Sequence, residues 1–297
     1  NNSCKIMIKN NNEKRDMKNF SGKTVVTVHD LSHIQYPQFH PQERVRWLDD
    51  KLPETIDRAD ALITISKFSK QEIIKTFNIK AQNIEIVPPA VSSFFHLIST
   101  ENEKKLLKQK YKLPDKFVLS VATLEPRKNI ISLIQAFSRL DPSLRKEYPL
   151  VLAGCDGWLT DELNKVALPL MKRGQLIRLG YVDQQDLPTL YQTATLFVYV
   201  SLYEGYGMPI SEAMASHTAV ITSSLSSMPE VAAGSAQLVQ PLDIEQISYE
   251  IAELLENPEK RTLQEDRAKE ISRTYTWDES VNKMINVLNK LESGTLK

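Results

Sequence analysis

This chain of 297 residues has few cysteines and no excess of charge of either sign. Cys4 and Cys155 are the only cysteines, and they lack metal-ligand spacing, which indicates a reducing compartment. Lys and Arg together number 37, as do Asp and Glu, so the basic surplus that nucleic-acid binding needs is missing. No apolar run approaches the roughly 20 residues that span a bilayer, and no secretory signal is visible. We therefore expect a cytoplasmic protein with no nucleic-acid partner.

Two motifs of nucleotide and metal chemistry are missing as well. No Gly-x-Gly-x-x-Gly follows a predicted strand, and the chain has only nine glycines, which argues against a nucleotide-dependent dehydrogenase. No Asp-x-Asp motif for Mg²⁺ occurs either, so the sequence offers no motif for a metal.

What the sequence does contain is an alternation of short β-branched runs and helical patterns. A chain of this length predicts two domains, and the alternation falls into two series separated at about residues 88–100, where Pro88 and Pro89 break the pattern. Strands that are apolar throughout and separated by helices predict parallel sheets buried on both faces, as in doubly wound α/β proteins. The expected strands cover residues 23–28, 61–65, 84–87, 117–122, 150–153, 176–179, 196–200, 220–222 and 237–239.

The pattern divides the chain into four segments. Residues 1–21 are polar, rich in Asn and Lys, and are predicted to be a tail or loop. Residues 22–96 form a first Rossmann-like lobe with only three strand signals, so we expect this lobe to be incomplete. Residues 97–276 form the second lobe. Residues 277–297 begin with Trp277, predicted to be a core aromatic, and continue as an amphipathic helix.

The richest group of glycines and carboxylates follows the seventh of the nine predicted strands, the one at residues 196–200. Ligands of open α/β sheets bind beyond the carboxyl ends of the strands, and Gly205 and Gly207 let the backbone approach such a ligand. Glu204 lies in the loop and Glu212 in the first helical turn, where carboxylates are suited to accept hydrogen bonds from sugar hydroxyls. Taken singly, Glu212 is better interpreted as a charge that complements the helix dipole, and Glu204 as a solvated loop acid. Only the whole string, with its spacing, is specific.

A second group follows the strand expected at residues 117–122. Pro126 turns the chain, and the adjacent cations Arg127 and Lys128 open a helix. Cations at a helix N-terminus oppose its dipole, which favours an anionic partner over an exposed basic pair, and Arg beside Lys suits a diphosphate. His29, followed by Asp30, ends the first predicted strand, where a histidine has roughly even odds of being catalytic or structural.

The string from Glu204 to Glu212 resembles the Glu-x7-Glu pattern of glycosyltransferase family 4, whose members have the two-lobed GT-B fold and retain the anomeric configuration. The resemblance extends over about residues 22–292. It implies that Glu204 holds hydroxyls of the donor sugar and that Glu212 holds the nucleotide ribose. It also implies that the backbone from Gly205 through Tyr206 to Gly207 lies against the sugar.

Other residues match the same family. The string A-T-L-E-P-R-K-N, which contains Arg127 and Lys128, resembles the family segment that contacts the donor diphosphate. The string T-V-H-D is similar to a motif whose histidine, here His29, lies near the transferred sugar and the acceptor. The segment that contains Arg178 and Tyr181 resembles the family segment that meets the nucleobase. The resemblance also implies that the C-terminal helix returns to brace the first lobe.

The chain departs from the family in several places. His217 and Ala219 stand where the family usually has Gly and Pro, so strain is expected at the helix end at His217. No Gly-rich loop precedes the first predicted strand, so we expect the first lobe to be shortened at its N-terminal side. The turn from Gly154 through Gly157 to Trp158 is a weaker match to the family's A-G-x-x-G-W.

The resemblance implies that a mannose- or rhamnose-like sugar moves from a nucleotide diphosphate sugar to an acceptor hydroxyl, in bacterial surface-polysaccharide assembly. The expected catalytic residues are His29, Arg127, Lys128 and Glu204, with no cofactor and no metal. The expected acceptor is a lipid-linked glycan or another hydroxyl compound, with peripheral contact at the inner membrane face. The alternative is a non-catalytic or fragmentary nucleotide-sugar-binding homologue, which the missing strands and the changes at residues 217 and 219 favour.

Overall fold

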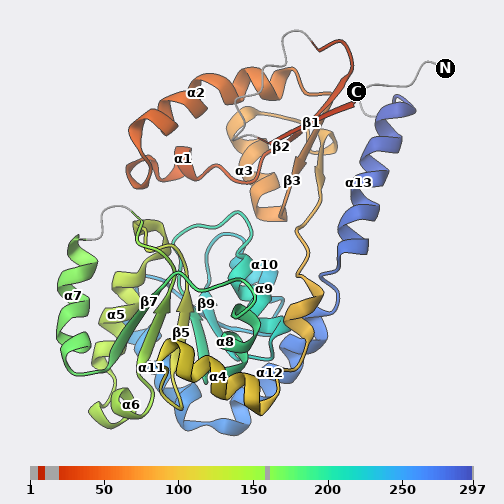
Figure 1. The fold of residues 1–297 in the computed structure, drawn as a ribbon. Helices are drawn as coiled ribbons and strands as arrows, with labels where there is room; N and C mark the ends of the chain where they lie inside the picture. Colours follow the sequence, from red (N-terminus) through yellow and green to blue (C-terminus); the bar gives the residue numbers. More distant parts are fainter. Residues whose placement is uncertain (1–5, 11–19, 158–160, 296–297) are drawn as a thin grey trace. The chain divides into compact units, whose positions relative to one another are not determined.

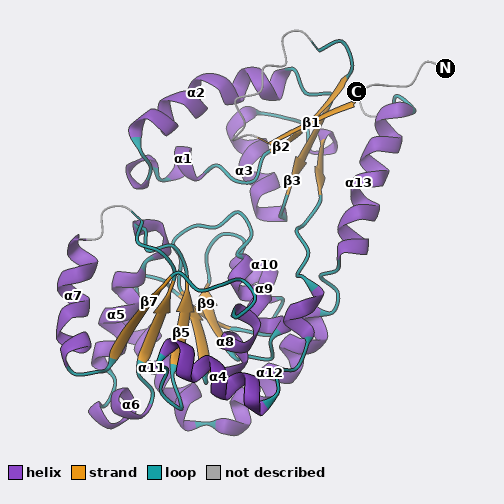
Figure 2. Cartoon of the chain, viewed as in Figure 1, coloured by secondary structure: helices purple, strands orange, loops and turns teal. Residues whose placement is uncertain are grey.

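In the computed structural model, which describes residues 6–10, 20–157 and 161–295, the chain divides into two compact units (Figure 1). The first comprises Asn1–Ala90, Glu204–Tyr206 and Trp277–Lys297, and the second comprises Val91–Tyr203 and Gly207–Thr276. Each unit has its own parallel sheet with helices beside it (Figure 2). The α/β fold class expected from the sequence is confirmed.

Among its described residues, the first unit has a sheet of four parallel strands in the order β1-β2-β3-β4. Successive side chains of a strand point to opposite faces. Val26 therefore packs in a core with helix residues on one face, whereas its neighbour Val25 packs with residues near the C-terminus on the other. The strands are β1 (Ile6–Asn10), β2 (Lys23–Thr27), β3 (Ala61–Thr64) and β4 (Ile84–Ile86).

Helices cover both faces of this sheet. Leu52 and Ile73 pack against the face that contains Val26, and Val287 and Leu291 pack against the face that contains Val25. The C-terminal helix therefore braces the first unit, as the family resemblance implied. The helical segments are α1 (Ser32–Gln35), η1 (Pro37–Phe39), α2 (Gln42–Asp57), α3 (Lys67–Phe77), η2 (Ala81–Asn83) and α13 (Trp277–Glu292).

Two expectations for this unit are wrong. Ile6–Asn10, assigned to a polar tail or loop, forms β1 and pairs in parallel with Lys23–Thr27. Three apolar residues in a polar context give a weak local signal, and the pairing with β2 supplies the rest. Residues 1–5 and 11–19 of the same predicted tail lie outside the described residues. Trp277, expected in the core, is 60% exposed, because α13 buries a different stripe that contains Val287 and Leu291.

The sheet of the second unit has six parallel strands in the order β10-β9-β8-β5-β6-β7. All six strands expected after residue 100 are present. The strands are β5 (Val118–Val121), β6 (Leu150–Ala153), β7 (Leu176–Gly180), β8 (Leu196–Tyr199), β9 (Val220–Ser223) and β10 (Gln237–Val239). Because β5 pairs with both β6 and β8, the strand order reverses at β5, which makes the β5–β8 boundary the topological switch point of this sheet.

Helices flank the second sheet on both sides (Figure 2). The helix after β5 is strongly amphipathic, because one of its faces packs in the core. Leu133, Ile134 and Phe137 on that face are almost fully buried. The helical segments are η3 (Ser93–His96), α4 (Glu101–Tyr111), η4 (Pro126–Lys128), α5 (Ile130–Arg139), α6 (Pro142–Glu147), α7 (Asp161–Lys172), α8 (Leu187–Thr193), α9 (Met208–Ala215), α10 (Met228–Ala232), α11 (Ile244–Glu256) and α12 (Pro258–Ser272).

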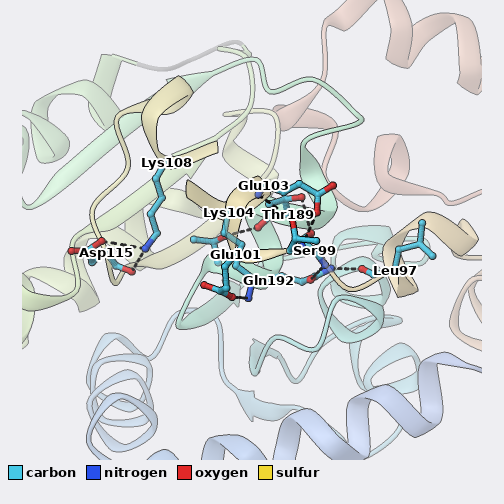
Figure 3. A network of polar contacts seen from close by, with 11 residues as sticks. Leu97, Ser99, Glu101, Glu103, Lys104, Lys108, Asp115, Thr189 and Gln192 are labelled. Atoms are coloured by element: carbon cyan, nitrogen blue, oxygen red, sulfur yellow. Dashed lines mark hydrogen bonds and ion pairs between the residues drawn. The ribbon is translucent and has the colours of Figure 1, made fainter. Parts of the chain in front are cut away.

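A polar network fastens the start of the second unit to α8 (Figure 3). The Ser99 amide donates to Gln192 Oε1 at 2.8 Å, and Gln192 Nε2 donates to the Leu97 carbonyl at 2.7 Å. The hydroxyls of Ser99 and Thr189 lie 2.8 Å apart. Thr100 and Glu103 then form a reciprocal capping box that begins α4. These contacts fix α8, which contributes a tyrosine to the site described below.

The end of α9 confirms one expected departure. His217 has φ 58°, in the left-handed region that favours glycine. Its amide donates to the Met214 carbonyl at 3.2 Å, and the Thr218 amide donates to the Ala213 carbonyl at 3.0 Å, so the helix ends in a glycine-type cap without a glycine.

Over the part of the chain that the structure describes, no helix has the length and apolar character needed to span a bilayer. Within the same residues, His, Cys, Asp and Glu do not gather in threes at a possible metal site.

Candidate active site

The predicted donor-site loops of the second unit follow the two strands that meet at the switch point. Arg127 and Lys128 follow β5, and the segment that leads to Glu204 follows β8. Such a boundary separates the βα loops on either side and leaves a crevice beyond the carboxyl ends of the strands. The topology therefore places both loops at the position where α/β proteins bind their ligands.

The loop after β5 is held by its own side chains. Arg127 donates to Glu125 Oε1 through Nε at 3.1 Å and through NH2 at 2.7 Å, and its NH1 donates to the Tyr203 carbonyl at 2.8 Å. The Arg127 side chain is 15% exposed and that of Glu125 is 7% exposed, so the ion pair is largely shielded from water. Arg127 therefore ties its loop to the residue immediately before Glu204. The pattern of residues did not predict that Glu125 is its partner, although the acid lies only two residues away.

Asn129 fixes the exit from the same loop. It has φ 55° and separates the 3-10 turn at Pro126–Lys128 from α5. Its buried amide Nδ2 donates to the Val200 carbonyl at 3.0 Å and to the Pro241 carbonyl at 2.6 Å. Asn tolerates the left-handed conformation better than most residues. The last residue of the A-T-L-E-P-R-K-N string is thus a structural residue.

Lys128 contacts an aromatic residue that the sequence did not single out. Its Nζ donates to the Tyr199 hydroxyl at 2.9 Å and lies 5.5 Å from the centre of the Tyr199 ring. Tyr199 is the last residue of β8 and is only 2% exposed. The cation expected to meet the diphosphate is therefore held by a buried tyrosine.

The turn after β6 packs against the backbone of the loop that follows β5. Gly154 has φ +135°, and a Cβ there would lie 1.9 Å from the Ala122 carbonyl oxygen. A Cβ at Gly157 would lie 2.8 Å from the Leu124 carbonyl oxygen. Both glycines are required because the turn lies directly against the backbone that leads to Arg127. Trp158, the last residue of the matched string, lies outside the described residues.

Glu204, Gly205 and Tyr206 belong to the first unit. All three are buried, and Glu204 is 7% exposed. A Cβ at Gly205 would lie 2.6 Å from the His29 carbonyl oxygen. Ser69 Oγ lies 3.1 Å from that oxygen and 3.2 Å from the Gly205 carbonyl oxygen, and its one proton is donated to one or the other. The structure therefore brings His29 together with the segment that contains Glu204.

Gly207 and Glu212 belong to the second unit and to α9. Gly207 has φ +104° and precedes the helix, which begins at Met208 with Pro209 in its second position. Glu212 is the fifth residue of α9, so the expectation that it lies in the first turn is wrong. The interpretation as a charge that complements the helix dipole loses its basis, because the dipole effect is confined to the terminal turn.

Glu212 is instead paired with a buried tyrosine. The hydroxyl of Tyr191, on α8, donates to Glu212 Oε2 at 3.0 Å. Burial raises the pKa of the Glu212 carboxyl, and the hydrogen bond from Tyr191 lowers it in part. Burial, followed by the charge of Glu212, raises the pKa of Tyr191 well above its ordinary value, so Tyr191 stays protonated and remains a donor.

His29 and Asp30 follow β2, the strand predicted to precede them. Asp30 Oδ1 accepts a hydrogen bond from the Ser32 amide at 2.9 Å, an Asx-turn contact that was not predicted. His29 is half-buried. The structure thus confirms where the T-V-H-D string lies in the fold, and the role of His29 remains a prediction.

Arg178 and Tyr181 lie at the opposite edge of the second sheet, on and just beyond β7, two strands away from β5. Arg178 NH1 donates to Asn164 Oδ1 at 2.7 Å, and Arg178 NH2 forms an ion pair with Asp156. Tyr181 is 68% exposed. The guanidinium is therefore fixed between the turn after β6 and α7, and the predicted contact with a nucleobase stays a prediction.

Comparison with known proteins identifies the class of this fold and site. Residues 101–271 match the family "Glycosyl transferases group 1", and residues 17–93 match "Glycosyltransferase Family 4". The chain belongs to these glycosyltransferases. The class of enzyme expected from the Glu204 to Glu212 string is confirmed.

Individual relatives narrow this class. Over 270 residues the chain is 37% identical to the O-antigen chain mannosyltransferase B of Escherichia coli. The alignment covers 91% of this chain and 71% of that protein. It is also 37% identical over 235 residues to the serotype-specific mannosyltransferase WbdA of Escherichia coli, which covers 77% of this chain. That match spans only 29% of WbdA, less than a third of its length.

A solved structure shares the fold. The Anabaena protein HepE, in complex with UDP and glucose, superposes with a TM-score of 0.74 and covers 92% of this chain and 72% of that protein. The two sequences are 19% identical, so the likeness concerns the fold alone. The expected GT-B fold is confirmed.

Proposed function

We propose that this glycosyltransferase moves a mannose- or rhamnose-like sugar from a nucleotide diphosphate sugar to an acceptor hydroxyl, in bacterial surface-polysaccharide assembly. The observation that carries the proposal is the arrangement at the switch point of the second sheet. There the cations Arg127 and Lys128 follow β5, and α9 with Glu212 follows the neighbouring strand β8. The names of the two Escherichia coli relatives, both mannosyltransferases, favour a mannose-type donor.

The proposed reaction retains the anomeric configuration. The bond between the sugar C1 and the diphosphate oxygen breaks, and the acceptor oxygen bonds to C1 on the same face. The acceptor proton passes to the leaving phosphate. Negative charge develops on the diphosphate, so fixed cations lower the barrier most when they face that group. Arg127 and Lys128 fill this role and make a metal ion unnecessary.

The remaining site residues bind the donor. Glu204 accepts hydrogen bonds from sugar hydroxyls, the Gly205, Tyr206 and Gly207 backbone lies against the sugar, and Glu212 accepts from the ribose. His29 contacts the transferred sugar and the acceptor. Arg178 and Tyr181 meet the nucleobase. The acceptor is a lipid-linked glycan or a similar hydroxyl compound, which a cytoplasmic chain reaches by peripheral contact with the inner membrane face.

Binding of nucleoside diphosphates tests the proposal. GDP, UDP, ADP and dTDP are titrated separately by calorimetry into the wild-type chain, Arg127→Lys, Lys128→Ala and the control Lys116→Ala. Lys116 is matched to Lys128, because it also lies over a tyrosine ring, that of Tyr148, at 5.2 Å. A hydrogen bond to a charged group contributes about 1.5–3 kcal/mol. Lys128→Ala should therefore lower the affinity for the nucleoside diphosphate by roughly one to two decades.

The variants of the two cations answer different questions. Arg127→Lys keeps the charge but loses the fork that joins Glu125 to the Tyr203 carbonyl, so a smaller loss of affinity is expected than for Lys128→Ala. The control Lys116→Ala should bind as the wild type does. Unchanged affinity in Lys128→Ala would show that this residue is not a phosphate ligand. A wild-type chain that binds none of the four nucleotides would contradict the proposed function.

A further inference from the structure

A row of buried aromatic rings connects the two charged residues of the proposed donor site. The rings of Phe197 and Tyr199 lie 6.0 Å apart and nearly parallel, at 17°. They are two residues apart on β8 and therefore face the same side of the sheet. Tyr191, from α8, meets Phe197 edge to face at 5.2 Å. All three side chains are at most 2% exposed.

One end of this row holds a lysine. The Tyr199 hydroxyl accepts from Lys128 Nζ at 2.9 Å, and the ammonium lies 5.5 Å from the centre of the Tyr199 ring. Lysine has a flexible stem, so its side chain loses conformational freedom when it is fixed. A tyrosine that restrains the ammonium before a ligand arrives removes part of that loss from the binding step.

The other end of the row holds a carboxylate. The Tyr191 hydroxyl donates to Glu212 Oε2 at 3.0 Å. The position of Tyr191 is fixed because α8 is fastened on two sides. Lys110 and Tyr111 contact Asp186, just before α8, at 2.6 and 2.7 Å. Gln192 of α8 is bonded to the segment that precedes α4 (Figure 3).

We propose that Tyr199 and Tyr191 are positioning residues of the donor site, Tyr199 for the ammonium that meets the diphosphate and Tyr191 for the carboxylate that meets the ribose. This inference rests on the proposed function, and neither tyrosine itself touches the donor. The row of rings fixes the distance between the two charged groups, because Phe197 packs between the tyrosines. The few bonds between phosphate and ribose limit how far apart the two groups of a nucleoside diphosphate can lie, so a rigid spacer between their ligands favours binding.

The role of Tyr199 is tested with Tyr199→Phe and Tyr199→Leu. The phenylalanine keeps the ring and removes the hydroxyl, whereas leucine removes both the hydrogen bond and the ring contact. We expect GDP affinity to fall about tenfold in Tyr199→Phe and about threefold further in Tyr199→Leu, with guanosine affinity unchanged because guanosine has no phosphate. UDP with uridine, ADP with adenosine and dTDP with thymidine are titrated in parallel.

The matched control for this series is Tyr148→Phe, since Lys116 lies 5.2 Å from the centre of the Tyr148 ring, in the same unit but away from the switch point. It should leave GDP affinity unaltered. Thermal melts of all variants test whether they fold. If the leucine variant does not fold, Tyr199→Phe by itself tests the role of Tyr199. Equal losses for nucleoside and diphosphate would overturn the role of Tyr199, because they would indicate general damage to the fold.

The role of Tyr191 is tested by the pH dependence of binding. Glu212 accepts from the ribose as a carboxylate, so affinity is lost as the pH falls through its pKa. The hydrogen bond from Tyr191 lowers that pKa. Tyr191→Phe should therefore move the acid limb of the affinity profile of each nucleoside diphosphate to higher pH. The control Tyr275→Phe also removes a tyrosine hydroxyl that donates, here to the Val231 carbonyl at 2.7 Å, and should leave the limb in place.

The outcomes separate this inference from the function on which it rests. If the wild-type chain binds none of the four nucleoside diphosphates, the proposed function fails. If the wild type binds but Tyr191→Phe has the wild-type acid limb, the role of Tyr191 alone is overturned. A shifted limb in Tyr191→Phe and an unshifted one in Tyr275→Phe would support it.

Discussion

Gly154→Ala measures how closely the turn after β6 supports the loop with Arg127. An alanine Cβ would lie 1.9 Å from the Ala122 carbonyl oxygen and 2.6 Å from its carbon, so backbone must move by roughly 1 Å. The φ of +135° is also one that alanine rarely adopts. The backbone strain costs about 1–3 kcal/mol, and the overpacking costs about 1–3 kcal/mol more. A loss of about 2–6 kcal/mol lowers Tm by roughly 2–4 °C for each kcal/mol in a unit of this size.

The assay is differential scanning calorimetry, followed by nucleoside diphosphate titration well below the Tm. Gly174→Ala is the matched control, because its φ is +68° but nothing lies within 4 Å of a Cβ there. The control should lose only about 1 kcal/mol and keep its affinity. Gly154→Ala should also bind more weakly when folded, since Ala122 precedes the loop with Arg127. Equal losses of Tm in the two variants would refute the claim that close backbone contact, rather than φ alone, requires Gly154.

Two further substitutions are predicted to stabilise the fold. Burial raises the pKa of Glu212, so its charged form costs stability as the pH rises through that pKa. Calorimetry should find Glu212→Gln more heat-stable than the wild type at about pH 7.5, with the difference shrinking toward pH 4.5, the ordinary pKa of Glu. Its diphosphate affinity should fall about tenfold, and a Tm difference independent of pH would contradict this account. His217→Gly relieves the left-handed backbone at φ 58° and should add up to about 1 kcal/mol to the free energy of unfolding. A destabilised His217→Gly would mean that the half-buried imidazole contributes more than the strain costs.

Several features of the site were visible in the sequence because they depend on neighbours along the chain. Each strand of the second sheet is a short apolar run, since a parallel strand covered on both faces has no polar side. The glycines and charges that follow such a run lie at the carboxyl end of the strand whatever the rest of the fold does. Arg127 and Lys128 were therefore placed correctly after β5, and the Glu204 segment after β8. His217 was predicted to be strained for the same local reason, a helix that ends without glycine.

Other features depend on the tertiary structure. Ile6–Asn10 became a strand only because β2 offers an edge to pair with, and Trp277 is exposed because α13 turns another stripe toward the sheet. Glu212 falls beyond the first turn because the helix begins at Met208 rather than at Pro209 or later.

By itself the sequence determined the class of enzyme, the parallel α/β fold and the loops that hold its charged residues, because each is encoded in residues close together in the chain. Only the tertiary structure decided what holds those charges in place. Tyr199 lies 71 residues from Lys128, and Tyr191 lies 21 residues from Glu212. A hydrogen bond across such a separation exists only when the sheet has brought β5 beside β8 and α8 beside α9, and no local pattern of residues specifies it.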